Sequence, residues 1–310
     1  MSLHTILGAG GVVANDLAEA LIRKGEPVRL VSRQPKARPG ASLMSADISI
    51  PEETDRAVQG SSIVYLCAGL KYDFKIWRLL WPKIMNNCID ACKKHGARLL
   101  FFDNVYMYGR VDGMMTEETP YNPCSRKGDL RARIATQLMS EVRRDNLTAM
   151  IARSADFYGP GSEKTGMANI LVFENLAKKK KAQWISNIHV PHSFTYTKDI
   201  AASLLLLTGR EDAWNQTWHL PTAPQPPTME SFVQQAAEKM HAGSGISILS
   251  PFMIRIGGIF NTTIRELHEM TYQYKYPYLF DSSKFNHAFS FSPTSYSAGI
   301  QATALAYHHL

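Results

Sequence analysis

The stretch ILGAGGVVANDLAEAL, residues 6–21, joins a short apolar segment to a glycine-rich turn and an amphipathic segment. Gly8, Gly11 and Ala14 give the spacing G-x-x-G-x-x-A. Glycine allows a tight turn and a close approach of the backbone to a pyrophosphate, and the helix that follows offers free N–H groups to an anion. A small residue such as Ala14 lets this helix pack closely on the strand. The stretch therefore predicts a strand, a phosphate-binding turn and a helix, and the alternative is a tight turn without a ligand.

The alternation of apolar and amphipathic segments continues to about residue 162. Apolar runs such as PVRLVSR, SIVYLCAG, ARLLFFDN and LTAMIARSADFYG are separated by helical patterns. Nearly continuous apolar strands between helices indicate a parallel sheet buried on both faces, and right-handed crossovers make it doubly wound. We therefore expect an α/β fold, with a dinucleotide-binding Rossmann domain over residues 1–162. A smaller, mixed substrate-binding region is expected over residues 163–310, with some segments returning to the Rossmann sheet.

The composition of the chain limits the kinds of partner and ligand that we expect. The chain has 310 residues, a net charge of +7 and a pI of about 9.1. No stripe of Lys and Arg alternates with aromatics, so we expect no nucleic-acid partner. No segment has the length of a membrane span, and the first residues, MSLHTILGAG, lack the pattern of a signal peptide. The four cysteines show no metal-ligand spacing, so we expect reduced thiols, no metal, no membrane partner and a cytoplasmic location.

The segment after the second predicted strand, RLVSRQPK, bears on the choice of dinucleotide. A site that reads the ribose hydroxyls of NAD usually places an acid there, about 20 residues after the glycines. This segment has no acid and carries Arg33, with Lys36 and Arg38 close by. A guanidinium suits a 2′-phosphate, so we favour NADP over NAD. The alternative for Arg33 is a solvated loop residue.

Two further strand ends contribute candidate cofactor contacts. Asp47 and Ile48, in SADIS, lie at the end of the third predicted strand, where a carboxylate could accept a hydrogen bond from the adenine amine. The alternative is that Asp47 caps the following helix. Ala68 and Gly69 end the fourth strand, and their small size would leave room for a dinucleotide; simple close packing is the alternative.

These segments together resemble the NAD-dependent epimerase/dehydratase family of the extended short-chain dehydrogenase/reductase superfamily. GAGGVVA resembles its nucleotide loop, FFDNVYMYG its Ser-Ser-x-x-Val-Tyr-Gly segment, and ARSADFYGPG its Arg-x-x-x-Val-Tyr-Gly-Pro-Gly segment. The resemblance implies a Rossmann fold and an NADP or NAD cofactor. It also implies a nucleotide sugar or a related alcohol or carbonyl substrate, and a homodimer formed through the helices near residues 74–95 and 127–145. The nucleotide loop it implies consists of Gly8, Gly11, Val12, Val13 and Ala14.

The family's catalytic residues are replaced in this chain. The family uses a Tyr-x-x-x-Lys pair at a helix start, in which the tyrosine transfers the proton and the lysine holds the nicotinamide ribose. The matching positions are Lys127 and Arg131, in KGDLR, and the position of the helping Ser or Thr is Asn104. No tyrosine in the chain has a lysine four residues later. Arg131 could still bind ribose hydroxyls, and Asn104 could bind a substrate oxygen, but neither exchanges a proton usefully.

Three hypotheses follow for the replaced pair. The first is an active oxidoreductase or epimerase with a rebuilt proton path, in which Lys127, Tyr106, Tyr158 or His192 is the acid or base. The second is a cofactor-binding redox sensor or regulator resembling the NmrA-like branch. The third is that Lys127 and Arg131 are solvated cations without a role. Tyr106, Tyr158 and His192 are also candidate substrate contacts, and plain aromatic packing is the alternative for the two tyrosines.

Overall fold

The computed structural model describes residues 2–307, which fall into two compact units. The first unit comprises Met1–Met107, Arg126–Arg153 and Ile200–Trp218, and the second comprises Tyr108–Ser125, Ser154–Asp199 and His219–Leu310. The units interleave along the chain, and Ile200–Trp218 belongs to the first of them. The expected division into residues 1–162 and 163–310, with some segments returning to the sheet, stays a prediction.

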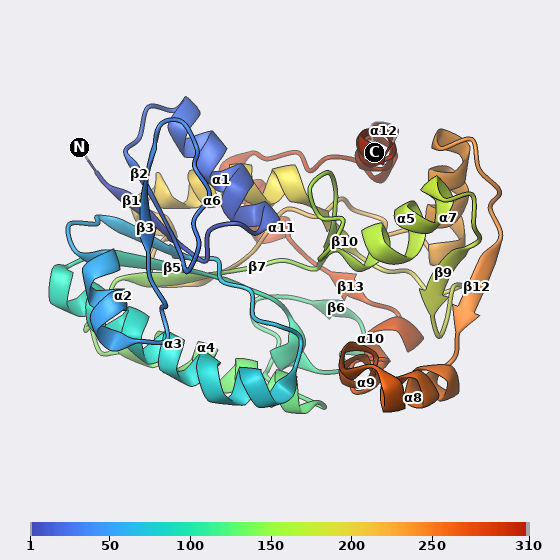
Figure 1. Ribbon diagram of the computed structural model, residues 1–310, viewed down its shortest axis with the longest axis horizontal. Helices are drawn as coiled ribbons and strands as arrows, with labels where there is room; N and C mark the ends of the chain where they lie inside the picture. The colour runs from blue at the N-terminus through green and yellow to red at the C-terminus, as the bar shows by residue number, and fades with distance from the viewer. Residues whose placement is uncertain (1, 308–310) are drawn as a thin grey trace. The chain divides into compact units, whose positions relative to one another are not determined.

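The first unit is built on a seven-stranded sheet in the order β11-β7-β5-β4-β1-β2-β3. All pairs from β3 to β7 are parallel. Helices α1 and α6 cover one face, and α2, α3 and α4 cover the other (Figure 1). This confirms the predicted doubly wound α/β fold. The strands are β1 (His4–Leu7), β2 (Val28–Ser32), β3 (Ala41–Ser45), β4 (Ile63–Leu66), β5 (Arg98–Asp103), β7 (Ala149–Arg153) and β11 (Thr217–His219).

The helices of this unit follow the apolar periodicity of the sequence. They are α1 (Val12–Arg23), α2 (Pro51–Val58), α3 (Phe74–His95), α4 (Arg126–Arg143) and α6 (Thr197–Thr208), with the short η1 (Tyr106–Tyr108) and η3 (Glu211–Ala213). Asp73 caps α3 by accepting a hydrogen bond from the Lys75 N–H, and Gly96 ends it in the left-handed conformation. Strands β1, β4 and β7 are buried along their whole length, as a sheet covered on both faces requires.

The strand order reverses between β1 and β4, which lie side by side in the middle of the sheet. In open α/β sheets, ligands bind beyond the carboxyl ends of the strands at this switch point. The glycine turn follows β1, and Ala68 and Gly69 follow β4. The fold therefore brings these sequence candidates to one edge of the sheet.

The second unit packs short strands and helices around an aromatic core. Tyr158, Phe173, Phe194 and Trp184 are buried at its centre. Its strands are β6 (Met114–Met115), β8 (Asp156–Tyr158), β9 (Ala182–Ile185), β10 (Phe194–Tyr196), β12 (Ile246–Leu249) and β13 (Leu279–Phe280). Its helices are η2 (Asn169–Phe173), α5 (Glu174–Ala177), α7 (Met229–Lys239), α8 (Pro251–Phe260), α9 (Thr262–His268), α10 (Tyr272–Lys275), α11 (Ser283–Phe289) and α12 (Tyr296–Tyr307).

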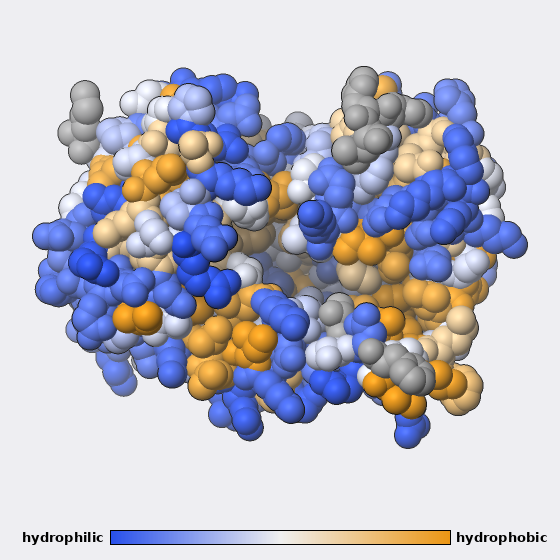
Figure 2. All heavy atoms as spheres, viewed as in Figure 1, coloured by the Kyte–Doolittle hydropathy of each residue, from blue (hydrophilic) through white to orange (hydrophobic). Residues whose placement is uncertain are grey.

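Helix α8 leaves large apolar side chains uncovered on the second unit. Phe252, Met253, Ile256 and Ile259 are all exposed, and hydrophobic atoms gather over this helix at the lower right of Figure 2. By contrast, no helix among residues 2–307 is both long and apolar enough to cross a bilayer.

Candidate active site

The glycine turn after β1 is fixed by a close approach of two backbones. Gly8 has φ of +91°, and its N–H donates to the Val31 carbonyl at 3.0 Å. A Cβ added to Gly8 would stand 2.3 Å from the Cα of Ala68. Only glycine fits this position, because a side chain would collide with the backbone that follows β4. The turn thus joins the ends of β1 and β4 at the switch point.

The N-terminus of α1 is open to an anion. Gly11 is the N-cap residue, no side chain accepts a hydrogen bond there, and the first turn contains no acid. A Cβ added to Gly10 or to Gly11 would meet no atom within 4 Å. The N–H groups at a helix start need acceptors, and here neither a cap nor a carboxylate supplies one. The residues present fit a phosphate group at this turn.

Val12, Val13 and Ala14 form the first turn of α1 with their side chains buried. Their contribution to a bound dinucleotide would therefore come from backbone N–H groups and from close packing. Ala68 is half-buried and Gly69 is exposed, at the end of the neighbouring strand.

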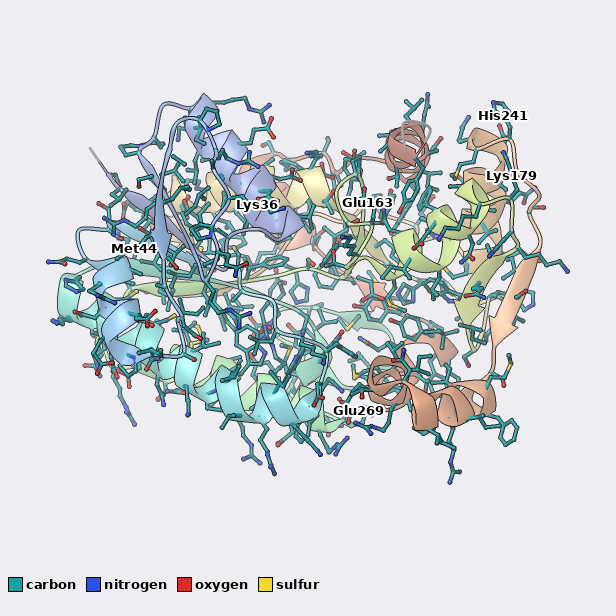
Figure 3. The ribbon with its side chains drawn as sticks, viewed as in Figure 1. Lys36, Met44, Glu163, Lys179, His241 and Glu269 are labelled. Atoms are coloured by element: carbon teal, nitrogen blue, oxygen red, sulfur yellow. The ribbon has the colours of Figure 1, made fainter. Side chains whose placement is uncertain are left out.

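Basic residues occupy the loop after β2. Arg33 and Lys36 are exposed, and Figure 3 labels Lys36 on this loop. Residues 33–38 contain no acid. An exposed guanidinium at the end of β2 is available to a 2′-phosphate.

Asp47 lies two residues beyond the end of β3 and is tied into a local turn. Its Oδ1 accepts hydrogen bonds from the Ser49 N–H at 2.9 Å and from the Ser49 hydroxyl at 2.7 Å. These bonds, and more weakly the charge of Arg33, lower the pKa of Asp47. The carboxylate thus shapes the turn before α2, beside the buried Ile48. Its contact with adenine stays a prediction.

Asn104 directly follows β5 and lies two residues before the short helix η1. Its N–H donates to Asp103 Oδ1 at 2.8 Å, and its Oδ1 accepts from the Tyr106 N–H at 3.0 Å. The side-chain oxygen is therefore engaged in a turn at the position of the family's Ser or Thr.

Lys127 and Arg131 lie one turn apart near the start of α4, and they are not surface charges. Their exposed fractions are 0% and 3%. The hypothesis of two solvated cations is therefore wrong, because α4 turns both side chains into the interior.

The guanidinium of Arg131 is held by Asp103. Its Nε donates to Asp103 Oδ1 at 2.8 Å, and its Nη2 donates to the same oxygen. It lies 4.4 Å from the centroid of the Trp81 ring and 4.9 Å from that of Phe101. Arg153, also buried, approaches Asp103 Oδ2 with its Nε at 3.7 Å. Hydrogen bonds to ribose would compete with this buried ion pair, so the geometry favours a structural role for Arg131.

The ammonium group of Lys127 lies against an aromatic ring. Its Nζ is 4.7 Å from the centroid of Tyr72, in the segment between β4 and α3. On the neighbouring side of the helix, Arg126 lies 4.6 Å from the centroid of Phe74. Tyr72, just before α3, and Phe74, the first residue of α3, thus attach this region to the start of α4 by two cation–aromatic contacts.

The three aromatic candidates fall in different surroundings. Tyr106 is half-buried and stacks on Trp77 at 6.4 Å in the first unit. Tyr158 and His192 belong to the second unit, each with an exposed fraction of 1%. Burial raises the pKa of Tyr158. This favours the packing alternative for Tyr158.

His192 is enclosed by aromatic rings and one carboxylate. It stacks on Tyr278 at 4.3 Å and on Tyr274 at 5.6 Å, and its Nε2 is 3.1 Å from Asp156 Oδ2. Such a site positions the ring firmly and leaves it little access to a substrate.

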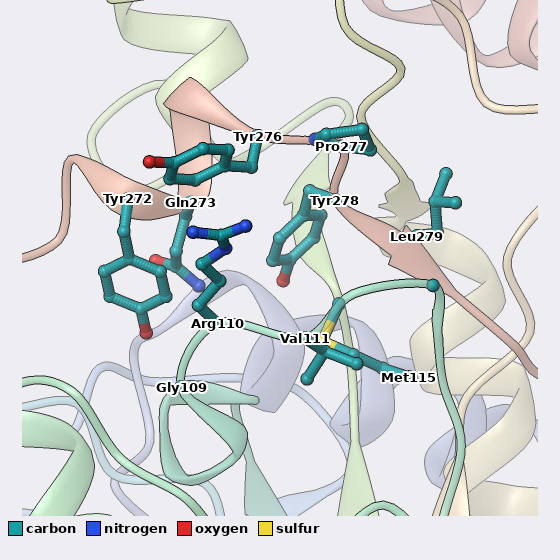
Figure 4. A pocket seen from close by; sticks show the side chains of 11 residues that line it. Gly109, Arg110, Val111, Met115, Tyr272, Gln273, Tyr276, Pro277, Tyr278 and Leu279 are labelled. Atoms are coloured by element: carbon teal, nitrogen blue, oxygen red, sulfur yellow. The ribbon is translucent and has the colours of Figure 1, made fainter.

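The second unit also contains a small aromatic pocket (Figure 4). The guanidinium of Arg110 lies 3.9 Å from the centroid of Tyr276 at this pocket. Its other lining residues are Gly109, Val111, Gly113, Met115, Tyr272, Gln273, Pro277, Tyr278 and Leu279. Within the described part of the chain, no group of three or more His, Cys, Asp or Glu is placed to hold a metal ion.

Sequence reasoning missed Asp103, Tyr72 and Trp77. Asp103 was visible as an acid after four apolar residues in LLFFDN, a pattern typical of a buried, paired carboxylate. Tyr72 and Trp77 gave no such signal, because their partners lie on other elements of the fold.

Comparison with known proteins agrees with this geometry. A model of the NAD dependent epimerase/dehydratase family matches residues 4–219, which is more than half of the chain. The chain belongs to this family. The expected membership in the NAD-dependent epimerase/dehydratase family is thus confirmed. No curated protein matches the chain.

Solved structures of epimerases and dehydratases share the fold at low identity. A UDP-glucose 4-epimerase from Thermotoga maritima with UDP-glucose has a TM-score of 0.82 and 16% identity, covering 99% of both chains. A dTDP-glucose 4,6-dehydratase from Bacillus anthracis with NAD has a TM-score of 0.81 and 14% identity, covering 100% of this chain and 97% of the other. A UDP-glucuronic acid 4-epimerase from Bacillus cereus with UDP-glucuronic acid and NAD gives 0.81 and 14%, covering 99% of both. At these identities the likeness shows the fold alone.

Proposed function

We propose that this epimerase/dehydratase family member binds a nicotinamide dinucleotide at the turn over residues 8–14 and oxidises or reduces an alcohol or carbonyl carbon of its substrate. The observation that carries the proposal is the uncapped, acid-free N-terminus of α1 beside two glycines with open space around them. Bound there, the cofactor would supply hydride transfer. The chain itself supplies the phosphate-binding turn, the basic loop after β2, the small residues Ala68 and Gly69 after β4, and Asn104 after β5.

NADP is the proposed cofactor because of charge at the end of β2. Arg33 and Lys36 are exposed there, and residues 33–38 contain no acid that could accept bonds from ribose hydroxyls. A guanidinium forms paired, charge-assisted hydrogen bonds with a phosphate.

A nucleotide sugar is the proposed substrate class. The support is family membership together with the shared fold of structures that contain UDP-glucose or UDP-glucuronic acid. We also propose a homodimer formed through α3 and α4, which pack against each other and leave Leu79 59% exposed on α3.

A cofactor-binding sensor without hydride chemistry is the second candidate. It is favoured by the buried ion pair of Arg131 with Asp103, which removes the lysine's ordinary role. The two functions differ in turnover. We expect a change in nicotinamide absorbance when the protein, NADP(H) and a panel of UDP- and dTDP-sugars are mixed. Tight binding of cofactor with no change across the panel would favour the sensor.

A further inference from the structure

The position of the family's tyrosine is occupied by Lys127, yet a tyrosine stands directly against it. The Nζ of Lys127 is 4.7 Å from the centroid of the Tyr72 ring. Lys127 is wholly buried and Tyr72 is half-buried. The tyrosine is thus the more accessible member of the pair.

The residues immediately before and after Tyr72 in the sequence are fixed by hydrogen bonds to α3. Asp73 caps α3, and the indole N–H of Trp77 donates to the Lys71 carbonyl at 3.0 Å. The Tyr72 ring meets Trp77 edge to face at 5.7 Å. A half-buried aromatic anchored by neighbours on each side keeps a defined position, which proton transfer requires.

Trp77 connects Tyr72 to the other replaced positions. Its ring also stacks on Tyr106, two residues after Asn104, and the guanidinium of Arg131 lies 5.9 Å from its centroid. Tyr72, Tyr106 and Arg131 therefore all contact one indole within the first unit, and Lys127 lies against Tyr72. The segment that carries Tyr72 also follows Ala68 and Gly69, at the switch-point edge of the sheet.

From this arrangement we propose that Tyr72 is the catalytic acid and base of the reaction, and that Lys127 is its positioning residue. In the family the tyrosine stands at the start of the helix that corresponds to α4. Here a cation occupies that position, and the phenol comes from the segment before α3. This inference rests on the proposed function. A cation beside a phenol favours the phenolate form, which is the lysine's effect in the ordinary pair.

The proton and the electron pair can be followed for oxidation of an alcohol. When bound, the oxidised nicotinamide would accept the hydride, with its two electrons, from the substrate carbon. The substrate hydroxyl gives its proton to the Tyr72 phenolate, and the C–O bond becomes a carbonyl. In the reverse direction the Tyr72 hydroxyl returns the proton. Asn104, beside Trp77's partner Tyr106, is placed to donate a hydrogen bond to the substrate oxygen.

The test uses Tyr72→Phe, which keeps the ring and the contact with Lys127 but removes the hydroxyl. Turnover should fall about 100-fold or more, the usual range for a lost acid or base, while NADPH still binds. Tyr276→Phe is the matched control, because Tyr276 also stacks on a cation but lies in the second unit. Its turnover should be unchanged. Turnover of Tyr72→Phe within about threefold of wild type would overturn the inference.

A titration of the cofactor-free protein separates this inference from the proposed function. The chain has 13 tyrosines, whose ionisation is followed by ultraviolet absorbance. The charged residues near Tyr72 along the chain are Lys71, Asp73, Lys75 and Arg78, and the first two turns of α4 carry Arg126, Lys127, Asp129, Arg131 and Arg133.

We expect one tyrosine to ionise before the others, and this step should vanish in Tyr72→Phe and move to higher pH in Lys127→Met. An early step that persists in Tyr72→Phe, or that does not move in Lys127→Met, overturns the inference, whether or not the wild type turns over any substrate. Absence of NADPH binding by a folded wild-type protein would instead overturn the proposed function.

Discussion

The Nε of Arg131 donates to Asp103 Oδ1 at 2.8 Å, inside a pocket formed by Trp81 and Phe101. This bond joins α4 to the end of β5. It explains why an arginine can replace the family's lysine without leaving a charge uncompensated in the interior. To bind the ribose as the family's lysine does, the guanidinium would have to give up bonds to Asp103.

Replacing Asp103 with Asn tests how much its ion pairs with Arg131 and Arg153 stabilise the folded protein. The substitution keeps the shape of the side chain but removes the negative charge between Arg131 and Arg153, both buried. Breaking a buried ion pair costs about 3–5 kcal/mol, so the urea midpoint should fall sharply. The control is Arg133→Ala on the same helix, where the ion pair with Asp129 is exposed. It should cost less than about 1 kcal/mol. Equal midpoints for the two variants would contradict the structural role.

Two glycines of the turn should respond differently to alanine. Gly8→Ala places a Cβ against the backbone of Ala68 in a left-handed conformation, so we expect a loss of about 2–3 kcal/mol of unfolding free energy. Gly11 has φ of −74° and open space around it, so Gly11→Ala should cost about 1 kcal/mol or less. Gly11→Ala should nevertheless weaken NADPH binding, because its methyl group enters the space for the phosphates. Thermal unfolding and fluorescence titration together distinguish the two effects.

The stability of the protein should depend on His4 below neutral pH. His4 is buried on β1 with its Nδ1 2.9 Å from the Tyr65 hydroxyl, and burial lowers its pKa. The unfolded chain takes up a proton near the ordinary value of about 6.5, while the folded chain resists it. Stability is therefore present above this pH and is lost as pH falls through it. The slope of unfolding free energy against pH between about 7 and 5.5 should be smaller in His4→Gln and unchanged in the exposed control His268→Gln. Equal slopes in wild type and His4→Gln would contradict this role.

Arg33 should set the preference between NADPH and NADH. Loss of a charge-assisted hydrogen bond to the 2′-phosphate costs about 1.5–3 kcal/mol, so Arg33→Ala should weaken NADPH binding about ten- to one-hundredfold. Its affinity for NADH should stay within about threefold of wild type. The ratio of the two dissociation constants is the quantity to measure, and a ratio unaffected by the substitution would exclude Arg33 from the site.

The sequence predicted the fold because its signals are local. The glycine spacing and the apolar strands both depend on neighbours in the chain. The sequence also located Lys127 and Arg131 at the start of a helix, since family motifs surround them. It did not indicate that both would be buried.

The contacts that give the candidate site its chemistry are long-range. Asp103, at the end of β5, binds Arg131 on α4, and Tyr72, just before α3, contacts Lys127 on α4. No periodicity or spacing within one segment reports such pairs. Tyr158 and His192 were candidate substrate contacts because of where they lie in the sequence. Aromatic rings from distant parts of the sequence surround both side chains and bury them.

The central claim is that the turn over residues 8–14 holds NADP(H), and a fluorescence titration of the wild-type protein with NADPH tests it most directly. We predict saturable binding of one NADPH per chain, tighter than binding of NADH and weakened in Gly11→Ala. A folded wild-type protein that leaves NADPH fluorescence unchanged at all concentrations would contradict the account.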